Sequence, residues 1–165
     1  MKRPLAIYPG SFDPPTNGHL DIIVRASRLF PNIVVAVTDN FNKNPTFPLE
    51  ERLQMLRLAT RHLPGVKVEK FNGLLVHYLD KKQSGVIIRG LRAVSDFEYE
   101  FQMALMNRRL SRRVETVFLI PDEANTYLSS SLVKEISRLG GPTKGLVPSP
   151  VEKIMQQRRR KAASK

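Results

Sequence analysis

Near its amino end the chain carries a segment in which a histidine could contact an anion. Residues 8–19 read YPGSFDPPTNGH, and Thr16 fits a helix N-cap, which places Gly18 and His19 in the first helical turn. Free backbone N–H groups and the helix dipole favour an anion there, and Gly18 would let a ligand approach the backbone closely. A partly buried structural histidine would explain His19 taken alone. Together with the helix end, the segment favours phosphate binding.

Two arginines could form a further cationic group. Arg89 and Arg92 flank Gly90 directly after an apolar run, and a pair of guanidinium forks suits phosphate oxygens. Ion pairs with the acidic residues Asp96, Glu98 and Glu100 would account for both arginines just as simply. The sequence leaves both interpretations open.

Hydroxyl groups and a lysine complete the set of candidates. Ser129, Ser130 and Ser131 stand at the start of an amphipathic segment, so they could form a second anion cradle at a helix N-terminus, although serine N-caps are common. Lys43 lies in the polar loop 40–47, where solvent exposure is the ordinary outcome for a lysine.

Five short apolar runs predict the strands that position these residues. They cover residues 5–9, 33–38, 66–71, 85–89 and 114–120. Continuous apolar runs are typical of strands buried on both faces. Amphipathic helical patterns alternate with them, and one of these has the apolar stripe Phe97, Phe101, Ala104 and Leu105. We therefore predict an α/β fold: a five-stranded parallel sheet with helices on both faces.

In such a sheet, ligands bind beyond the carboxyl ends of the strands. The histidine, the two arginines, the lysine and two helix N-termini all follow predicted strands, so we expect them at one edge of the sheet. This concentration of cationic and amide donors suits several phosphates at once, as in a nucleoside triphosphate beside a phosphorylated acceptor.

The composition limits the other chemistries. The 165 residues include no cysteine and three histidines, which excludes disulfides, thiolate zinc sites and thiol nucleophiles. We also expect no transition-metal centre built from protein ligands. The apolar stretch at the amino end is too short for a signal peptide or a membrane span, so we expect a cytoplasmic protein without a membrane partner.

The charge is strongly basic and unevenly distributed. Lys and Arg number 27 against 15 Asp and Glu, a formal net charge of +12. We expect the run Arg158–Lys161, near the carboxyl end, to be a solvated tail. A basic nucleic-acid-binding protein is a competing interpretation, but no recognisable DNA- or RNA-binding motif is present, so we expect no specific nucleic-acid partner.

The motifs in combination resemble one enzyme family. The segments AIYPGSFDPPTNGH, RGLRA with DFEYE, and SSSLVKE are similar to bacterial phosphopantetheine adenylyltransferases, in register from residue 4 to residue 150. TxGH by itself marks only the wider nucleotidyltransferase superfamily, whereas RGLR with DFEYE is more specific. The resemblance implies a Rossmann-like nucleotidyltransferase domain, residues 1–150, followed by a terminal helix and basic tail, residues 151–165.

The resemblance also implies an activity. AMP would pass from ATP to 4'-phosphopantetheine, giving 3'-dephospho-coenzyme A and pyrophosphate, with Mg²⁺ as cofactor held mainly by phosphates. A homohexamer built as two trimers is implied, and feedback inhibition by coenzyme A would fit a shared pantetheine channel. The attacking phosphate oxygen is already anionic, so the lack of a recognisable general base is no obstacle.

Residue roles follow from matching positions. The resemblance assigns catalysis to His19, Lys43 and Arg92. It assigns ATP binding to Ser11, Phe12, His19, Gly90, Leu91, Arg92, Glu100, Asn125, Thr126, Tyr127, Leu128, Ser129, Ser130 and Ser131. It assigns the acceptor to Ser11, Lys43, Leu75 and Arg89. Two positions depart from the family pattern: Asn44 replaces a second lysine of some members, and Asn125 replaces an aromatic residue of many, which bears on the nucleobase contact.

Three alternatives remain beside this assignment. The acceptor could be another phosphorylated compound such as nicotinate mononucleotide. His19 could act as a covalent nucleophile that carries AMP. The pocket could also serve a nucleotide sensor that binds ATP without turnover.

Overall fold

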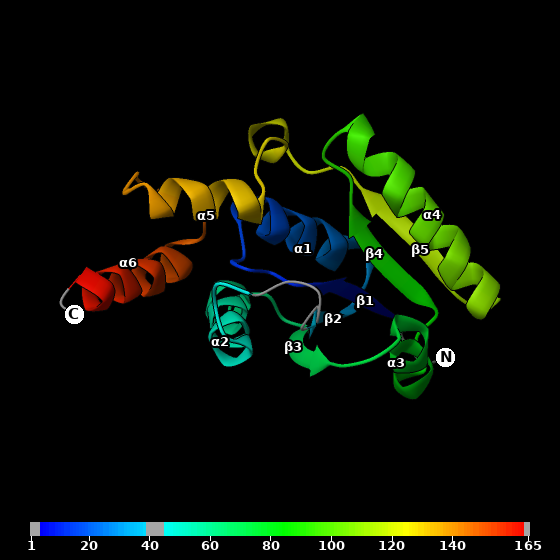
Figure 1. Ribbon diagram of the computed structural model, residues 1–165. Helices are drawn as coiled ribbons and strands as arrows, with labels where there is room; N and C mark the ends of the chain where they lie inside the picture. Colours follow the sequence, from blue (N-terminus) through cyan, green and yellow to red (C-terminus); the bar gives the residue numbers. More distant parts are fainter. Residues whose placement is uncertain (1–3, 39–44, 164–165) are drawn as a thin grey trace.

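A computed structural model describes residues 4–38 and 45–163, which form one sheet with helices around it (Figure 1). The strands are β1 (Leu5–Gly10), β2 (Asn32–Thr38), β3 (Val66–Phe71), β4 (Val86–Gly90) and β5 (Glu115–Leu119). The helices are α1 (Asn17–Leu29), α2 (Leu49–Thr60), α3 (Leu75–Lys82), α4 (Val94–Leu110), α5 (Ser130–Arg138) and α6 (Ser149–Ala163), with a short 3-10 helix, η1 (Glu123–Asn125), before α5. Strands and helices therefore alternate as the sequence predicts.

The strands form a parallel sheet in the order β3-β2-β1-β4-β5. The chain runs outward from β1 to β3 on one side and then returns to build β4 and β5 on the other side. The connections after β1 and β4 therefore diverge, which opens a crevice at the carboxyl ends of these two strands. The predicted α/β fold, with its five-stranded parallel sheet, is confirmed.

Helices bury both faces of this sheet, as predicted. On one face, Ile23 of α1 and Leu53 of α2 pack with Val35 in a first core cluster. On the other face, Leu79 of α3 packs with Ile87 of β4 in a second cluster. Figure 1 shows α1 and α2 on one side of the strands and α3 and α4 on the other.

Helix α4 forms where the sequence predicts a helix, but its apolar side stays largely exposed. Phe97, Phe101 and Leu105 retain 47%, 46% and 50% of their surface. The rings of Phe97 and Phe101 stack with centroids 5.6 Å apart, and Phe97 lies 6.5 Å from the ring of Phe118 in β5. The apolar stripe noted in the sequence is therefore real, but one chain does not cover it.

Helix α6 packs against α2 and does not extend freely from the protein. Val151 and Met155 join Met55 of α2 in a third apolar cluster. Residues 158–161 belong to α6 and stay exposed, as expected of a solvated segment, and Arg158 also pairs with Glu51 at 2.9 Å. None of the described helices, α6 included, combines the length and apolar composition needed to cross a membrane.

Candidate active site

A pocket of about 340 Å³ opens at the carboxyl ends of β1 and β4, beside the N-termini of α1 and α5. Its volume lies in the range of small-molecule sites. Most of the residues singled out in the sequence line it: Ser11, Phe12, His19, Arg89, Gly90, Arg92, Glu100, Leu128, Ser129, Ser130 and Ser131. The convergence expected from the parallel sheet is therefore present.

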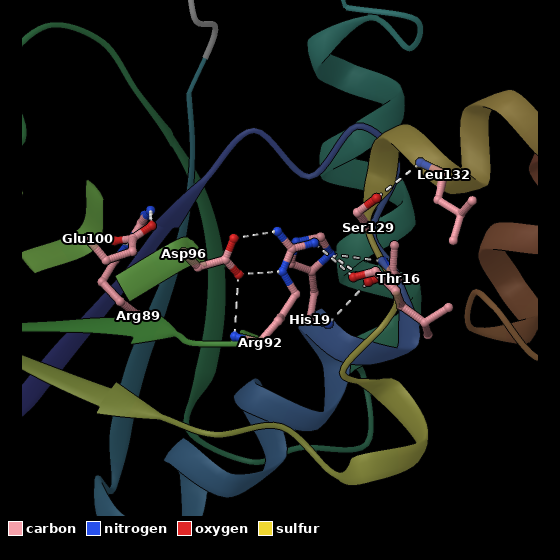
Figure 2. A network of polar contacts seen from close by, with 9 residues as sticks. Thr16, His19, Arg89, Arg92, Asp96, Glu100, Ser129 and Leu132 are labelled. Atoms are coloured by element: carbon pink, nitrogen blue, oxygen red, sulfur yellow. Dashed lines mark hydrogen bonds and ion pairs between the residues drawn. The ribbon is translucent and has the colours of Figure 1, made fainter. Parts of the chain in front are cut away.

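Thr16 and His19 are joined at the start of α1 by a reciprocal cap. The Thr16 hydroxyl accepts a hydrogen bond from the His19 backbone N–H, and the Thr16 backbone N–H donates to His19 Nδ1 at 3.0 Å (Figure 2). The Thr16 hydroxyl also lies 3.0 Å from Nδ1. The predicted N-cap is confirmed, and the capping contacts also hold the imidazole ring in one orientation.

The environment of His19 keeps the ring neutral. Burial, with added repulsion from Arg92 and Arg89, lowers the pKa of His19 from 6.5 to about 4. Because Nδ1 accepts the Thr16 N–H, the proton of the neutral ring is carried by Nε2. His19 is therefore a hydrogen-bond donor without a positive charge, held at the wall of the pocket.

The Phe12 ring packs against the His19 ring. Its side chain is only 1% exposed, and its ring meets the His19 ring edge on at a centroid distance of 5.1 Å. A Cβ on Gly10 would lie 2.9 Å from the Phe12 ring, so a glycine there gives the ring its space. Phe12 therefore has almost no surface left to contact a ligand.

Arg89 is fixed by a bidentate ion pair. Its Nε donates to Glu100 Oε2 at 2.6 Å, and its terminal nitrogen Nη2 pairs with Oε1 of the same carboxylate. The other terminal nitrogen, Nη1, donates to the carbonyl of Pro9 in β1 at 3.1 Å. Arg89, at the end of β4, thus connects this strand to β1 and to α4, and it also lines the pocket.

Arg92 has a similar but more exposed arrangement. It pairs with Asp96 at 3.0 Å and donates to the carbonyl of Leu128 at 2.9 Å, as Figure 2 shows for the ion pair. The ion-pair interpretation is confirmed for both arginines, with Glu100 and Asp96 of α4 as partners, and both arginines also line the pocket. The carboxylates fix the orientation of the two guanidinium groups at the pocket wall.

The serine run forms the predicted helix end. The Ser129 hydroxyl accepts from the Leu132 N–H at 3.1 Å and caps α5, which confirms the expected N-cap (Figure 2). Ser130 donates to the Pro14 carbonyl at 2.8 Å and so ties α5 to the loop after β1. Two helix N-termini therefore face one pocket, and each favours bound negative charge.

Several predicted residues lie elsewhere. Leu75, at the start of α3, packs against the second core cluster and does not line the pocket. The Leu91 N–H donates a hydrogen bond to the carbonyl of Leu119, the last residue of β5, at 2.9 Å. Asn125, Thr126 and Tyr127 lie in or after η1, outside the pocket lining, although the Asn125 carbonyl lies 3.4 Å from the position of a Cβ on Gly18. Lys43 falls outside the described residues.

A buried polar network that the sequence analysis did not single out supports the loop after β1. Arg52, only 1% exposed, donates to the carbonyls of Phe47, Ser11 and Thr38 at 2.9, 2.7 and 3.0 Å. The signal that could have revealed Arg52 is its spacing: it lies three residues after Leu49, so this charged residue falls on the apolar side of α2. Arg52 therefore links the pocket loop to the end of β2.

Asp13 completes this network. It accepts hydrogen bonds from the N–H groups of Thr46 and Phe47, at 3.0 and 2.9 Å, and from Lys134 of α5 at 3.0 Å. Burial raises the pKa of Asp13, but these donors together outweigh burial and lower it below the usual value. The charged carboxylate thus fixes three segments around the pocket.

The described residues include no group of three or more His, Cys, Asp or Glu that could hold a metal ion. Two carboxylates line the pocket, those of Asp96 and Glu100, and each is paired with an arginine. The donor set therefore fits a metal ion that takes most of its ligands from a bound substrate.

Comparisons with known proteins find relatives that match most of the chain. The family model described as cytidylyltransferase-like matches residues 7–136. The phosphopantetheine adenylyltransferase of Dictyoglomus turgidum is 56% identical over 153 residues, which are 92% of this chain and 96% of that protein. The phosphopantetheine adenylyltransferase of Stenotrophomonas maltophilia is 53% identical over 162 residues, 98% of this chain and 96% of that protein.

A solved structure with low sequence identity shares the fold. A Vibrio parahaemolyticus protein proposed to be a nicotinate-nucleotide adenylyltransferase superposes with a TM-score of 0.73, covering 94% of this chain and 93% of its own. Its sequence is 14% identical, so the similarity concerns the architecture alone.

Proposed function

Because the chain belongs to the phosphopantetheine adenylyltransferase family, we propose that its pocket binds ATP next to 4'-phosphopantetheine and holds both for direct transfer of AMP. The reaction gives 3'-dephospho-coenzyme A and pyrophosphate. The observation that carries the assignment of the site is the convergence of His19, Arg89, Arg92 and the N-terminus of α5 on one pocket. These groups supply hydrogen-bond donors and positive charge where two polyanions must meet.

The mechanism follows from the state of each group. The attacking phosphate oxygen is an anion near neutral pH, so the protein positions it and need not remove a proton. His19 donates from Nε2 to a phosphate oxygen as negative charge gathers around the α-phosphorus. Arg89 and Arg92, oriented by Glu100 and Asp96, reduce the repulsion between the reactants.

Mg²⁺ is the proposed cofactor, bound mainly through the phosphates of ATP. When bound, it neutralises the pyrophosphate as this leaves. Among the described residues, the acidic side chains that line the same pocket are Asp96 and Glu100, and each is paired with an arginine. Removal of Mg²⁺ with a chelator should abolish turnover, and added Mg²⁺ should restore it.

Pyrophosphate release in the presence of ATP, Mg²⁺ and an acceptor tests the proposed reaction. We expect release with 4'-phosphopantetheine and little with nicotinate mononucleotide. Exchange of labelled pyrophosphate into ATP without acceptor should be absent, because direct transfer forms no adenylyl-enzyme. Exchange without acceptor would instead support the covalent role of His19, and ATP binding without turnover would support the sensor.

The remaining partner assignments belong to the same proposal. A homohexamer is supported by the exposed apolar side of α4, since an uncovered face of that kind is typical of an interface. Coenzyme A, which shares the pantetheine group with the product, is the proposed feedback inhibitor. Coenzyme A would act by binding in the substrate pocket. We place the enzyme in the cytoplasm, where ATP is abundant.

A further inference from the structure

Tyr8 is a buried polar residue that the mechanism above does not use. Its side chain is 5% exposed and belongs to the first core cluster, yet it lines the pocket. Among the described residues, its hydroxyl has no hydrogen-bond partner. The same residues contain no fully enclosed side-chain oxygen or nitrogen without a partner, so the Tyr8 hydroxyl must reach the open pocket.

The surroundings hold the Tyr8 ring in place. Tyr8 lies on the face of β1 that packs against α1. Its ring meets the Phe12 ring edge on, at a centroid distance of 5.3 Å. Phe12 in turn contacts His19 at 5.1 Å, so the three rings form a continuous row. The Tyr8 hydroxyl lies 3.8 Å from the position of a Cβ on Gly90, which places it at the β4 wall of the pocket.

The hydroxyl is a neutral donor. Burial raises the pKa of Tyr8 well above its usual 10, and although Arg89 and Arg92 oppose this effect and Glu100 adds to it, burial dominates. At neutral pH the group therefore keeps its proton and can donate it to an oxygen acceptor. A phenylalanine would fill the same core position without an unpaired polar atom, so the hydroxyl contributes nothing to the fold that phenylalanine would lack.

We propose that the Tyr8 hydroxyl is an additional nucleotide-binding group, which donates a hydrogen bond to an oxygen atom of bound ATP. The proposal rests on the proposed function of the pocket. ATP is favoured over the acceptor because the Tyr8 hydroxyl adjoins Gly90, a position that the family resemblance assigns to ATP binding. A bound oxygen acceptor would satisfy the Tyr8 hydroxyl, which has no partner among the described residues.

The variants Tyr8→Phe and Tyr78→Phe test this role as a matched pair. Tyr78, on α3, donates its hydroxyl to Glu69 at 2.9 Å and lies outside the pocket lining. Each variant loses only one oxygen atom. Both are compared with the wild-type protein by thermal melting without ligand, by calorimetric titration with ATP, and by steady-state kinetics with each substrate varied in turn.

For Tyr8→Phe we expect an unchanged or higher melting temperature, because no hydrogen bond within the protein is lost. The Kd and KM for ATP should rise by about tenfold, as for one lost hydrogen bond to a ligand, while the KM for 4'-phosphopantetheine stays within twofold. Tyr78→Phe should show the opposite pattern: a lower melting temperature and unchanged ATP binding.

Two results would overturn the role of Tyr8. One is a Tyr8→Phe variant that binds ATP as tightly as the wild-type protein. The other is a melting temperature lowered as far as in Tyr78→Phe, which would reveal a partner within the protein. Both differ from failure of the proposed function, in which the wild-type protein itself would release no pyrophosphate with the two substrates.

Discussion

The backbone N–H of Thr16 lies 3.0 Å from Nδ1 of His19, and this contact decides which nitrogen of the ring carries the proton. A cationic imidazole would have to give up this hydrogen bond, since a protonated Nδ1 cannot accept. The helix N-terminus, the two arginines and burial all oppose a positive charge at the same place. In the proposed reaction His19 would therefore act as a neutral donor, and its effect would come from its position.

Replacement of His19 by alanine should reduce kcat by about a hundred- to a thousandfold, the usual effect of losing one preorganised donor to a transition state. The fold should be retained, since the sheet and its core do not depend on this ring. Pyrophosphate release and circular dichroism measure the two effects. His62→Ala, at an exposed position, is the control and should keep full activity. A folded His19→Ala protein with near-normal turnover would disprove the assigned role.

The low pKa of His19 predicts a pH dependence of stability. In the unfolded chain the ring titrates near 6.5, whereas in the folded protein it titrates at about 4. Between these values the unfolded state binds the extra proton, so the free energy of unfolding falls as the pH is lowered from 6.5 to 4 and is unaffected by this group above 6.5. The contribution amounts to about 3 kcal/mol.

Chemical denaturation of the wild-type protein and of His19→Gln, at pH 7 and at pH 4, measures the contribution of His19 to the free energy of unfolding. The wild-type protein should lose about 3 kcal/mol more than the variant over this range. In addition, kcat/KM should not fall from pH 6.5 to 8.5 through deprotonation of His19, because the free enzyme already holds a neutral ring. Equal losses in the two proteins would show that His19 is charged before unfolding.

Glu100→Gln should weaken the site through Arg89. The variant loses the charged partner that holds the guanidinium in place, and its free energy of unfolding should fall by about 2 kcal/mol. The KM for 4'-phosphopantetheine should rise by about tenfold as Arg89 loses its orientation. Glu98→Gln removes an exposed carboxylate from the same helix and should change neither quantity. Identical kinetics in the two variants would exclude orientation by Glu100.

Leu105→Glu should prevent assembly of the proposed hexamer. Leu105 is 50% exposed on the uncovered apolar side of α4, and a charge buried there in an interface has no partner. Sedimentation velocity should show species smaller than the wild-type assembly. Leu139→Glu places the same charge at a leucine that is 74% exposed at the end of α5, and its assembly should be unchanged. A hexamer that persists in Leu105→Glu would place the interface elsewhere.

The sequence determined the features that depend on neighbours along the chain. Each strand is an apolar run, and the caps formed by Thr16 and Ser129 involve residues three positions away, so local spacing reveals them. The parallel order of strands then brings the loops after β1 and β4 together, which is why His19, Arg89 and Arg92 could be expected in one place.

Only the tertiary structure decided which distant atoms meet. Arg52 reaches the carbonyl of Ser11 across 41 positions of the chain, and Asp13 reaches Phe47 across 34, and no local pattern specifies such pairs. The apolar stripe of α4 has the right period for a buried face, yet Phe97, Phe101 and Leu105 retain 47%, 46% and 50% of their surface, because the neighbours within one chain do not cover them. Likewise, the Tyr8 hydroxyl finds no partner in the part of the chain that the structure describes, because the core around it is apolar, and that depends on packing in three dimensions.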